Sequence, residues 1–177
     1  MAEELIRVDS PWNVDYRKSA GAYGSIFLTH LREKGKLLAT RCPKCQRWSI
    51  PPTIICALCH VEIPEYPRGW VELSGKGYLV YWDKVVTPMM NILGELKVHP
   101  YLLCRVKLDE GPGYGHYLGV VPNSEEEGKL KRGMRVELEM KPMEERVGLA
   151  EYDIKYFKVL WDEPINEEAI KGAGLGF

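Results

Sequence analysis

Apolar residues near the start of the chain recur at helical spacing, with charged and small residues between them. Between Asp15 and about Lys36 the apolar positions are Tyr16, Ala20, Tyr23, Phe27 and Leu31. Their spacing of three or four residues predicts an amphipathic helix. Gly21 and Gly24 weaken this prediction, because a glycine costs a helix about 1 kcal/mol relative to alanine. The apolar face covers either the rest of this chain or another subunit, and the sequence leaves both open.

A different pattern begins near residue 68, where apolar and polar residues alternate as they do in β-strands. The first alternating segment, 70–86, is interrupted at Ser74–Gly77, which predicts a bulge or bend. Four more segments alternate in the same way: 99–109, 116–121, 134–142 and 151–161. A turn-rich loop at 111–115 and a polar insert at 124–133, expected as a short helix or loop, separate them. Five strands with this insert predict a small Greek-key barrel of the OB type, with a β-sandwich as the alternative.

These patterns divide the chain into four parts and predict a mainly β protein. Residues 1–37 carry the amphipathic helix, 38–67 form a cysteine-rich segment, 68–163 form the barrel and 164–177 form a C-terminal tail. The last residues, KGAGLGF, are rich in glycine, and we expect them to be mobile. A hydrophobic content of 45% and a charged content of 28% are typical of globular proteins.

The cysteine-rich segment contains two C-x-x-C pairs, Cys42 with Cys45 and Cys56 with Cys59. Such a turn directs both sulfurs at one ion, and two turns supply the four thiolates of a tetrahedral zinc ribbon. The single iron of a rubredoxin-type electron carrier has the same geometry and remains the alternative. His60 follows the last cysteine and is a further candidate ligand, although four thiols already complete the site. Because no coordination position stays open for water, we expect the metal to be structural.

The other residues form no catalytic motif, so we expect no catalytic residue in this chain. It has no G-x-S-x-G or H-E-x-x-H segment, and the glycine-containing segments 69–77 and 111–116 lack the spacing of phosphate-binding loops. Cys104, the unpaired cysteine, is a candidate nucleophile beside His99 or His116. A lone cysteine within an apolar strand is more often a small buried residue, which is the interpretation we favour.

The net charge of −1 is unevenly distributed along the chain. Residues 1–68 hold ten Lys/Arg and seven Asp/Glu, a net +3, which leaves −4 for the remainder. Zinc ribbons and OB folds also occur in single-stranded nucleic-acid-binding modules, which is the alternative function, but the negative remainder argues against it. The chain starts without an apolar signal segment, and no apolar run reaches the ~18 residues that span a bilayer. We therefore expect a cytoplasmic protein with no membrane contact.

Taken in order, several short landmarks extend over roughly residues 16–160. They are Leu37-Leu38, Cys42-Pro43-x-Cys45, Pro51-Pro52, Cys56-x-x-Cys59, Trp70, Ser74-Gly75-x-Gly77, Leu108-Asp109-Glu110-Gly111 and Gly133-Met134-x-Val136. Each landmark is weak alone, but the ordered set is specific. It resembles the family of rubredoxin-like zinc-ribbon plus OB-fold proteins that accompany thiolase-superfamily enzymes.

The resemblance implies a non-catalytic subunit that forms a hetero-oligomer, such as a heterotetramer, with a thiolase-family catalytic subunit. Members of that family accompany archaeal acetoacetyl-CoA thiolase with HMG-CoA synthase, and thiolases or hydratases of steroid and aromatic breakdown. The partner would carry the catalytic Cys and His. Because this chain keeps all four cysteines, the resemblance also implies one structural zinc ion. The expected reaction of the complex is thiolytic cleavage of an aromatic acyl-CoA, such as benzoylsuccinyl-CoA.

Coenzyme A and acyl-CoA are the ligands that such a complex would share. Arg41, Lys44 and Arg47 are candidates to contact the phosphates, and Trp48 is a candidate to stack on the adenine. The alternative is that all four are ordinary solvated residues of the ribbon.

Overall fold

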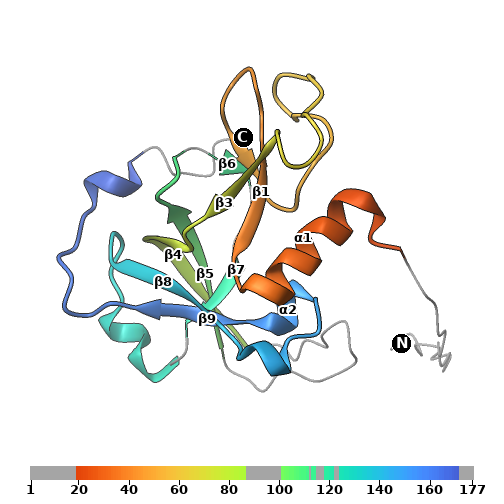
Figure 1. The fold of residues 1–177 in the computed structure, drawn as a ribbon. Coiled ribbons are helices and arrows are strands. Elements are labelled where there is room, and N and C mark those ends of the chain that lie inside the picture. Colours follow the sequence, from red (N-terminus) through yellow and green to blue (C-terminus); the bar gives the residue numbers. More distant parts are fainter. Residues whose placement is uncertain (1–18, 87–100, 112, 115–117, 122–123, 172–177) are drawn as a thin grey trace, which may run out of the picture.

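The computed structural model of the chain describes residues 19–86, 101–111, 113–114, 118–121 and 124–171. Figure 1 shows a helix, α1, lying beside a small sheet that projects at one end, with a larger sheet curled beneath them. The protein is therefore mainly β, as the alternation of apolar residues predicts. In the described part of the chain, no helix combines the length and apolar character needed to cross a bilayer.

Helix α1 spans Gly21–Lys34 and confirms the helical periodicity over its described part. The predicted start is too early, because residues 19 and 20 precede the helix, and residues 15–18 lie outside the described residues. Phe27 and Leu31 are buried against the core. Gly21 stands at the first position, where a glycine interrupts no helical turn. Gly35 ends the helix in the left-handed conformation (φ 65°), and its N–H donates to the Leu31 carbonyl at 2.8 Å.

The smaller sheet has the order β3-β1-β2-β6. Its strands are β1 (Leu37–Arg41), β2 (Trp48–Ser49), β3 (Trp70–Leu73) and β6 (Gly113–Tyr114). Strand β1 pairs antiparallel with β2 and β3, whereas β6 pairs parallel with β2. The sequence pattern predicts a loop at 111–115, but β6 lies in this segment and extends the smaller sheet. Such pairing depends on a strand far away in sequence, so the local pattern does not reveal it.

The larger sheet is five-stranded, with the order β7-β5-β4-β8-β9 and antiparallel pairing throughout. Its strands are β4 (Lys76–Val85), β5 (Tyr101–Leu108), β7 (Leu118–Val121), β8 (Arg135–Met140) and β9 (Ile154–Val159). The two edge strands, β7 and β9, lie close together without a hydrogen-bonded ladder between their described residues. The sheet is thus an unclosed barrel compatible with the predicted OB type, which is partly open.

The long alternating segment 70–86 is two strands rather than one interrupted strand. Gly75 has φ 74°, and the chain turns there from β3 in the smaller sheet to β4 in the barrel. The bend predicted at Ser74–Gly77 is therefore the point where the chain changes sheets. Close to the start of the last predicted strand, a short helix, α2 (Ala150–Asp153), precedes β9.

Three short 3₁₀ helices complete the described elements: η1 (Ser124–Lys129), η2 (Met143–Glu145) and η3 (Glu168–Ile170). Helix η1 lies in the polar insert, as expected. In the segment 164–177, which the sequence suggests is a tail, the Ile170 side chain is buried and Lys107 Nζ donates to the Ala169 carbonyl at 2.6 Å. The chain is therefore held on the barrel up to this point. Residues 172–177 lie outside the described residues.

One hydrophobic core joins the helix, the smaller sheet and the barrel. It includes Leu31 from α1, Leu37 from β1, Trp48 from β2, Leu79 from β4 and Phe157 from β9. The cysteine-rich segment thus rests on the same core as the barrel, which fixes its position relative to the rest of the molecule.

Polar contacts hold α1 at the junction of the two sheets. Glu72 of β3 contacts both the helix and the short link that follows it. Its Oε2 atom is 3.0 Å from His30 Nε2 in α1, and its Oε1 atom is 2.5 Å from Lys36 Nζ between α1 and β1. The hydrogen bond from Lys36 is the main cause that lowers the pKa of Glu72; burial opposes it and His30 adds to it. Arg146 donates from Nη1 to the Arg32 carbonyl at 3.2 Å and so ties the end of α1 to the barrel.

Asp153 holds the segment that follows η2. Its side chain is completely buried, and its two carboxylate oxygens accept hydrogen bonds from the backbone N–H groups of Val147 (2.8 Å) and Gly148 (2.9 Å). A buried carboxylate that accepts from two N–H groups is compensated for the water it has lost.

Candidate metal centre

The first C-x-x-C turn is built by strands β1 and β2. Strand β1 ends next to Cys42, whose N–H donates to the Arg47 carbonyl at 2.9 Å, while its own carbonyl accepts from the Gln46 N–H at 3.0 Å. The Cys45 N–H points at the Cys42 sulfur, 3.4 Å away. Gln46 adopts φ 60°, a left-handed conformation that is uncommon for a residue other than glycine. The turn is therefore set by local backbone hydrogen bonds.

The second C-x-x-C turn repeats this geometry without two flanking strands. The Cys56 N–H donates to the Val61 carbonyl at 3.0 Å, and the His60 N–H donates to the Cys56 carbonyl at 2.9 Å. His60 adopts φ 53°, as Gln46 does at the matching position of the first turn. The two turns are thus the same knuckle built twice, and each follows from its own short stretch of sequence.

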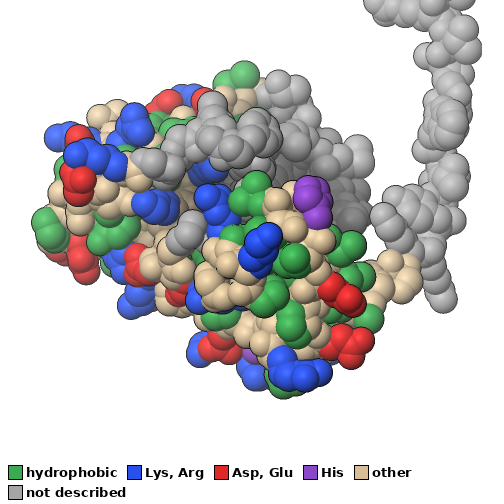
Figure 2. Space-filling model, turned by 90° about the horizontal axis from the view of Figure 1, so that it is seen from above, with side chains coloured by type: hydrophobic (Ala, Val, Ile, Leu, Met, Phe, Trp, Pro, Cys, Tyr) green, Lys and Arg blue, Asp and Glu red, His purple; other side chains and the backbone are tan. Residues whose placement is uncertain are grey.

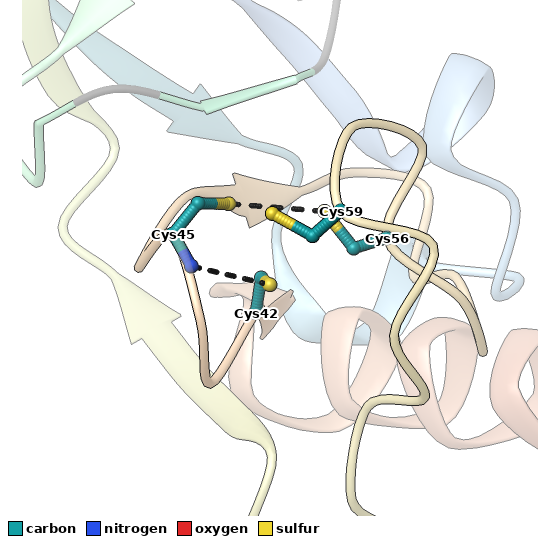
Figure 3. Close-up of side chains that lie close together, drawn as sticks. All are labelled: Cys42, Cys45, Cys56 and Cys59. Carbon is teal, nitrogen blue, oxygen red and sulfur yellow. Dashed lines mark hydrogen bonds between the residues drawn. The ribbon is translucent and has the colours of Figure 1, made fainter.

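The two knuckles face each other and bring the four sulfurs together. All four Sγ atoms lie within 4.8 Å of one another, and Figure 3 shows the four side chains converging. The Sγ atoms of Cys45 and Cys56 are 3.7 Å apart. Four sulfurs at ~2.3 Å from one tetrahedral ion would be separated by about 3.8 Å, so the spacing fits a bound metal. The four cysteines are therefore positioned to bind a metal ion.

The thiols are in an environment that suits a cation. Burial raises the pKa of the Cys42 thiol, but hydrogen bonds with the backbone of Cys45 and Lys44 outweigh burial and lower it to about 7. Burial and the neighbouring thiols, Cys45 and Cys56 among them, raise the pKa of Cys59 to about 12. Four thiolates crowded in this way would need a compensating cation, which a thiophilic ion such as zinc would supply.

The four cysteines leave no free coordination position on a tetrahedral ion. Cys42 and Cys56 are buried, Cys45 and Cys59 are half-buried, and four sulfurs fill a tetrahedral shell. Among the described residues, one group of His, Cys, Asp or Glu side chains is close enough to share an ion. It consists of these four cysteines and does not include His60. The arrangement can hold a metal and fasten the two knuckles, but it leaves no position for a metal-bound water.

The basic candidates for coenzyme A surround the first knuckle. Arg41 is half-buried at the end of β1, and its Nε atom is buried with no hydrogen-bond partner among the described residues. Lys44 is exposed on the knuckle and Arg47 is half-buried beyond it. Trp48 does not fit the expected role in stacking. It is only 4% exposed, and its indole N–H donates to the Gly111 carbonyl at 3.1 Å, so the ring belongs to the core.

Cys104 lies in the core rather than in a site. It is 0% exposed within β5, so no substrate reaches its sulfur in this structure. His99 and His116, the histidines considered as its partners, lie outside the described residues. The fold therefore supports the interpretation of Cys104 as a small buried residue.

Sequence reasoning missed the contact that joins the ribbon to the barrel. The turn after β5 accepts the Trp48 indole N–H through the Gly111 carbonyl and the Ser74 N–H through Glu110 Oε1, at 3.1 and 2.6 Å. Two of the sequence landmarks, Leu108-Asp109-Glu110-Gly111 and Ser74-Gly75-x-Gly77, meet at this junction. The sequence marks both stretches as landmarks, but nothing in either stretch predicts that they contact each other.

Comparison with known proteins agrees with this geometry. Residues 30–65 match the model of a family described as ChsH2, rubredoxin-like zinc ribbon domain. A solved structure named Ltp2-ChsH2(DUF35) aldolase resembles the fold with a TM-score of 0.54 and 19% identity, covering 81% of this chain and 98% of that chain. A DUF35-family protein of unknown function from Sulfolobus solfataricus matches with a TM-score of 0.46 and 18% identity, covering 78% of this chain and 84% of that chain.

Proposed function

We propose that this chain, which carries the rubredoxin-like zinc ribbon of the ChsH2 family, is a non-catalytic zinc-binding subunit of a thiolase-type acyl-CoA enzyme. The observation that carries the proposal is the closed four-cysteine cluster set on the same core as an OB-type barrel. A metal held by four sulfurs cannot activate water, so a reaction of the complex would take place on another subunit. The structural neighbour named as an Ltp2-ChsH2(DUF35) aldolase supports a role beside a catalytic partner.

The metal is proposed to be a single structural zinc ion. Zinc prefers tetrahedral sulfur ligands and performs no redox chemistry, which suits a site that only fastens two knuckles. Elemental analysis of the purified protein should find about one zinc per chain, and the protein solution should be colourless. Stoichiometric iron with visible absorption would instead indicate an electron carrier of the rubredoxin type.

Arg41, Lys44 and Arg47 are proposed to contact the phosphates of coenzyme A at the boundary with the partner. The exposure of Lys44 and the partial exposure of Arg41 and Arg47 support this role, because a phosphate oxygen needs cationic groups that it can reach. Replacing Arg41 with Gln in the complex should raise the Kd for coenzyme A, measured by isothermal titration calorimetry. Glu144→Gln, a change at an exposed position on the barrel side, is the control that should leave the Kd unchanged.

The proposed substrate is an aromatic acyl-CoA such as benzoylsuccinyl-CoA, cleaved by thiolysis. Only the family resemblance supports this specificity. A panel of acyl-CoA thioesters offered to the assembled complex would test it, with the release of the shorter acyl-CoA as the readout. A complex that turns over aliphatic but no aromatic thioesters would refute the substrate class and leave the subunit role in place.

Coexpression with the proteins encoded beside this chain tests the subunit role. We expect a stable complex with a thiolase-superfamily protein whose activity or solubility depends on the chain. A larger subunit that is fully active alone, or a chain that forms no complex and catalyses a reaction by itself, would overturn the proposal.

The alternative, a single-stranded nucleic-acid-binding module, finds little support on the described barrel. Several of its basic side chains are paired with acidic ones: Lys76 with Glu137, Lys84 with Glu127, Arg135 with Asp109 and Lys155 with Glu139. Paired charges do not form the basic groove that such ligands require. Salt-dependent binding of a single-stranded oligonucleotide, measured by fluorescence anisotropy, would favour the alternative.

A further inference from the structure

The second knuckle exposes large apolar side chains. Ile54, Ile55 and Leu58 are 54%, 56% and 47% exposed, and we call these three residues the apolar knuckle. The sequence around them contains no Lys, Arg, Asp or Glu between Arg47 and Glu62. Figure 2 looks onto this end of the molecule and shows hydrophobic side chains gathered there. An exposed, uncharged patch of this kind marks an interaction site more often than an ordinary surface does.

The turn that holds the second pair of cysteines does not require an apolar residue at position 58. The two knuckles have equivalent backbone hydrogen bonds. In each, the residue after the second cysteine, Gln46 or His60, adopts the left-handed conformation. At the position before that cysteine the first knuckle has Lys44, which is exposed, and the second has Leu58. Since the first knuckle has the same backbone geometry with an exposed lysine at this position, the turn does not demand a leucine there, and the apolar character of Leu58 has another cause.

We propose that the apolar knuckle inserts into an apolar recess on the catalytic partner, and that it anchors the complex. The inference rests on the proposed function and names the surface through which the partner is bound. The ribbon projects from the barrel, so its tip is convex (Figure 1). Three half-exposed side chains supply only part of the roughly 800 Å² that each partner buries in a standard interface. A concave surface on a larger protein can enclose the tip and contact the surrounding surface as well.

Two other occupants fit the surface less well. Two convex tips of identical chains cannot enclose each other, so a symmetric contact through the apolar knuckle would bury little area. An anionic membrane would meet Glu62 and Glu65, which are exposed directly after the patch. A protein surface can complement the apolar residues and both signs of charge at their border.

Serine substitutions of the three residues test the anchor in the full-length chain. The variant Ile54→Ser/Ile55→Ser/Leu58→Ser should keep one zinc per chain and weaken binding of the coexpressed thiolase-superfamily subunit by at least about tenfold in Kd. Met143→Ser/Val147→Ser is the matched control, because these side chains are 62% and 51% exposed in the barrel segment around η2. We expect the control to bind within about twofold of the wild type.

A second variant covers the case in which the triple substitution disturbs the ribbon. Leu58→Lys copies the residue found at the matching position of the first knuckle, so the backbone tolerates it. It should keep its zinc and still weaken the complex. Calorimetry gives the Kd, and elemental analysis with circular dichroism reports the integrity of the ribbon.

The outcomes separate this inference from the proposed function. A complex that forms with equal affinity for the wild type and both knuckle variants overturns the anchor and leaves the subunit role intact. A wild-type chain that binds no thiolase-superfamily subunit overturns both. A dimer of the chain alone, or flotation with phosphatidylserine vesicles, that is abolished by the knuckle variants while partner binding persists also overturns the inference.

Discussion

Replacing Gly77 with alanine tests why the Ser74-Gly75-x-Gly77 landmark exists. Gly77 lies in β4 between two neighbours, Leu108 of β5 and Val136 of β8. A Cβ atom added there would lie 2.3 Å from the Lys107 carbonyl oxygen. The clash is with the backbone of the adjacent strand, which no rotamer change relieves. The glycine is therefore required by the close approach of two strands.

The cost follows from the movement that alanine demands. Ordinary van der Waals contact begins at 3.4 Å, so β4 and β5 must separate locally by about 1.1 Å, the difference from 2.3 Å. A ladder hydrogen bond lengthened by about 1 Å is lost. Loss of two such bonds at roughly 1 kcal/mol each, with a similar cost for the displaced core packing, gives about 3 kcal/mol of destabilisation. For a chain of this size the melting temperature should fall by roughly 6–12 °C.

Thermal unfolding followed by circular dichroism, with zinc content checked beforehand, measures this effect. Gly128→Ala is the matched control, because a Cβ atom at Gly128 in η1 meets nothing within 4 Å. We expect the control to melt within about 2 °C of the wild type. If Gly77→Ala melts together with the control, the close approach of the strands is not a constraint and the reasoning fails.

Four further substitutions, the first with a control variant, report on the metal centre, on the segment after η2 and on the junction of helix and barrel. Cys42→Ser should lose the bound metal while Cys104→Ser retains it, as elemental analysis would show; equal metal contents would contradict the four-cysteine site. Asp153→Asn leaves one part-buried backbone N–H without an acceptor and should cost about 2 kcal/mol in urea denaturation; an unchanged midpoint would argue against the two hydrogen bonds. Arg146→Ala removes the hydrogen bond to the end of α1 and should speed amide exchange in the last helical turn; unchanged exchange would show that the bond is not needed. The lowered pKa of Glu72 stabilises the fold above the ordinary value of 4.5, and this stabilisation is lost as the pH falls. The difference in melting temperature between wild type and Glu72→Gln should therefore shrink between pH 6 and 3, whereas a constant difference would refute the link.

The sequence by itself determines the metal centre. Each knuckle is built from hydrogen bonds between residues at most five positions apart, such as Cys56 with Val61, so the C-x-x-C spacing carries the geometry. The same holds for α1 and for the barrel strands, whose periodicity records which face is buried. These properties depend on residues close together in the chain, so the sequence alone is enough to predict them.

Only the tertiary structure decided how these parts are joined. The assignment of β3 to the smaller sheet, the pairing of β6 with β2 and the docking of Ile170 all depend on partners far away in sequence. Trp48 shows the reason most clearly, since its indole N–H bonds to Gly111, 63 residues away. As a ribbon residue it has the chemistry of an adenine-stacking surface, but the free energy of burying its ring against the barrel core places it inside.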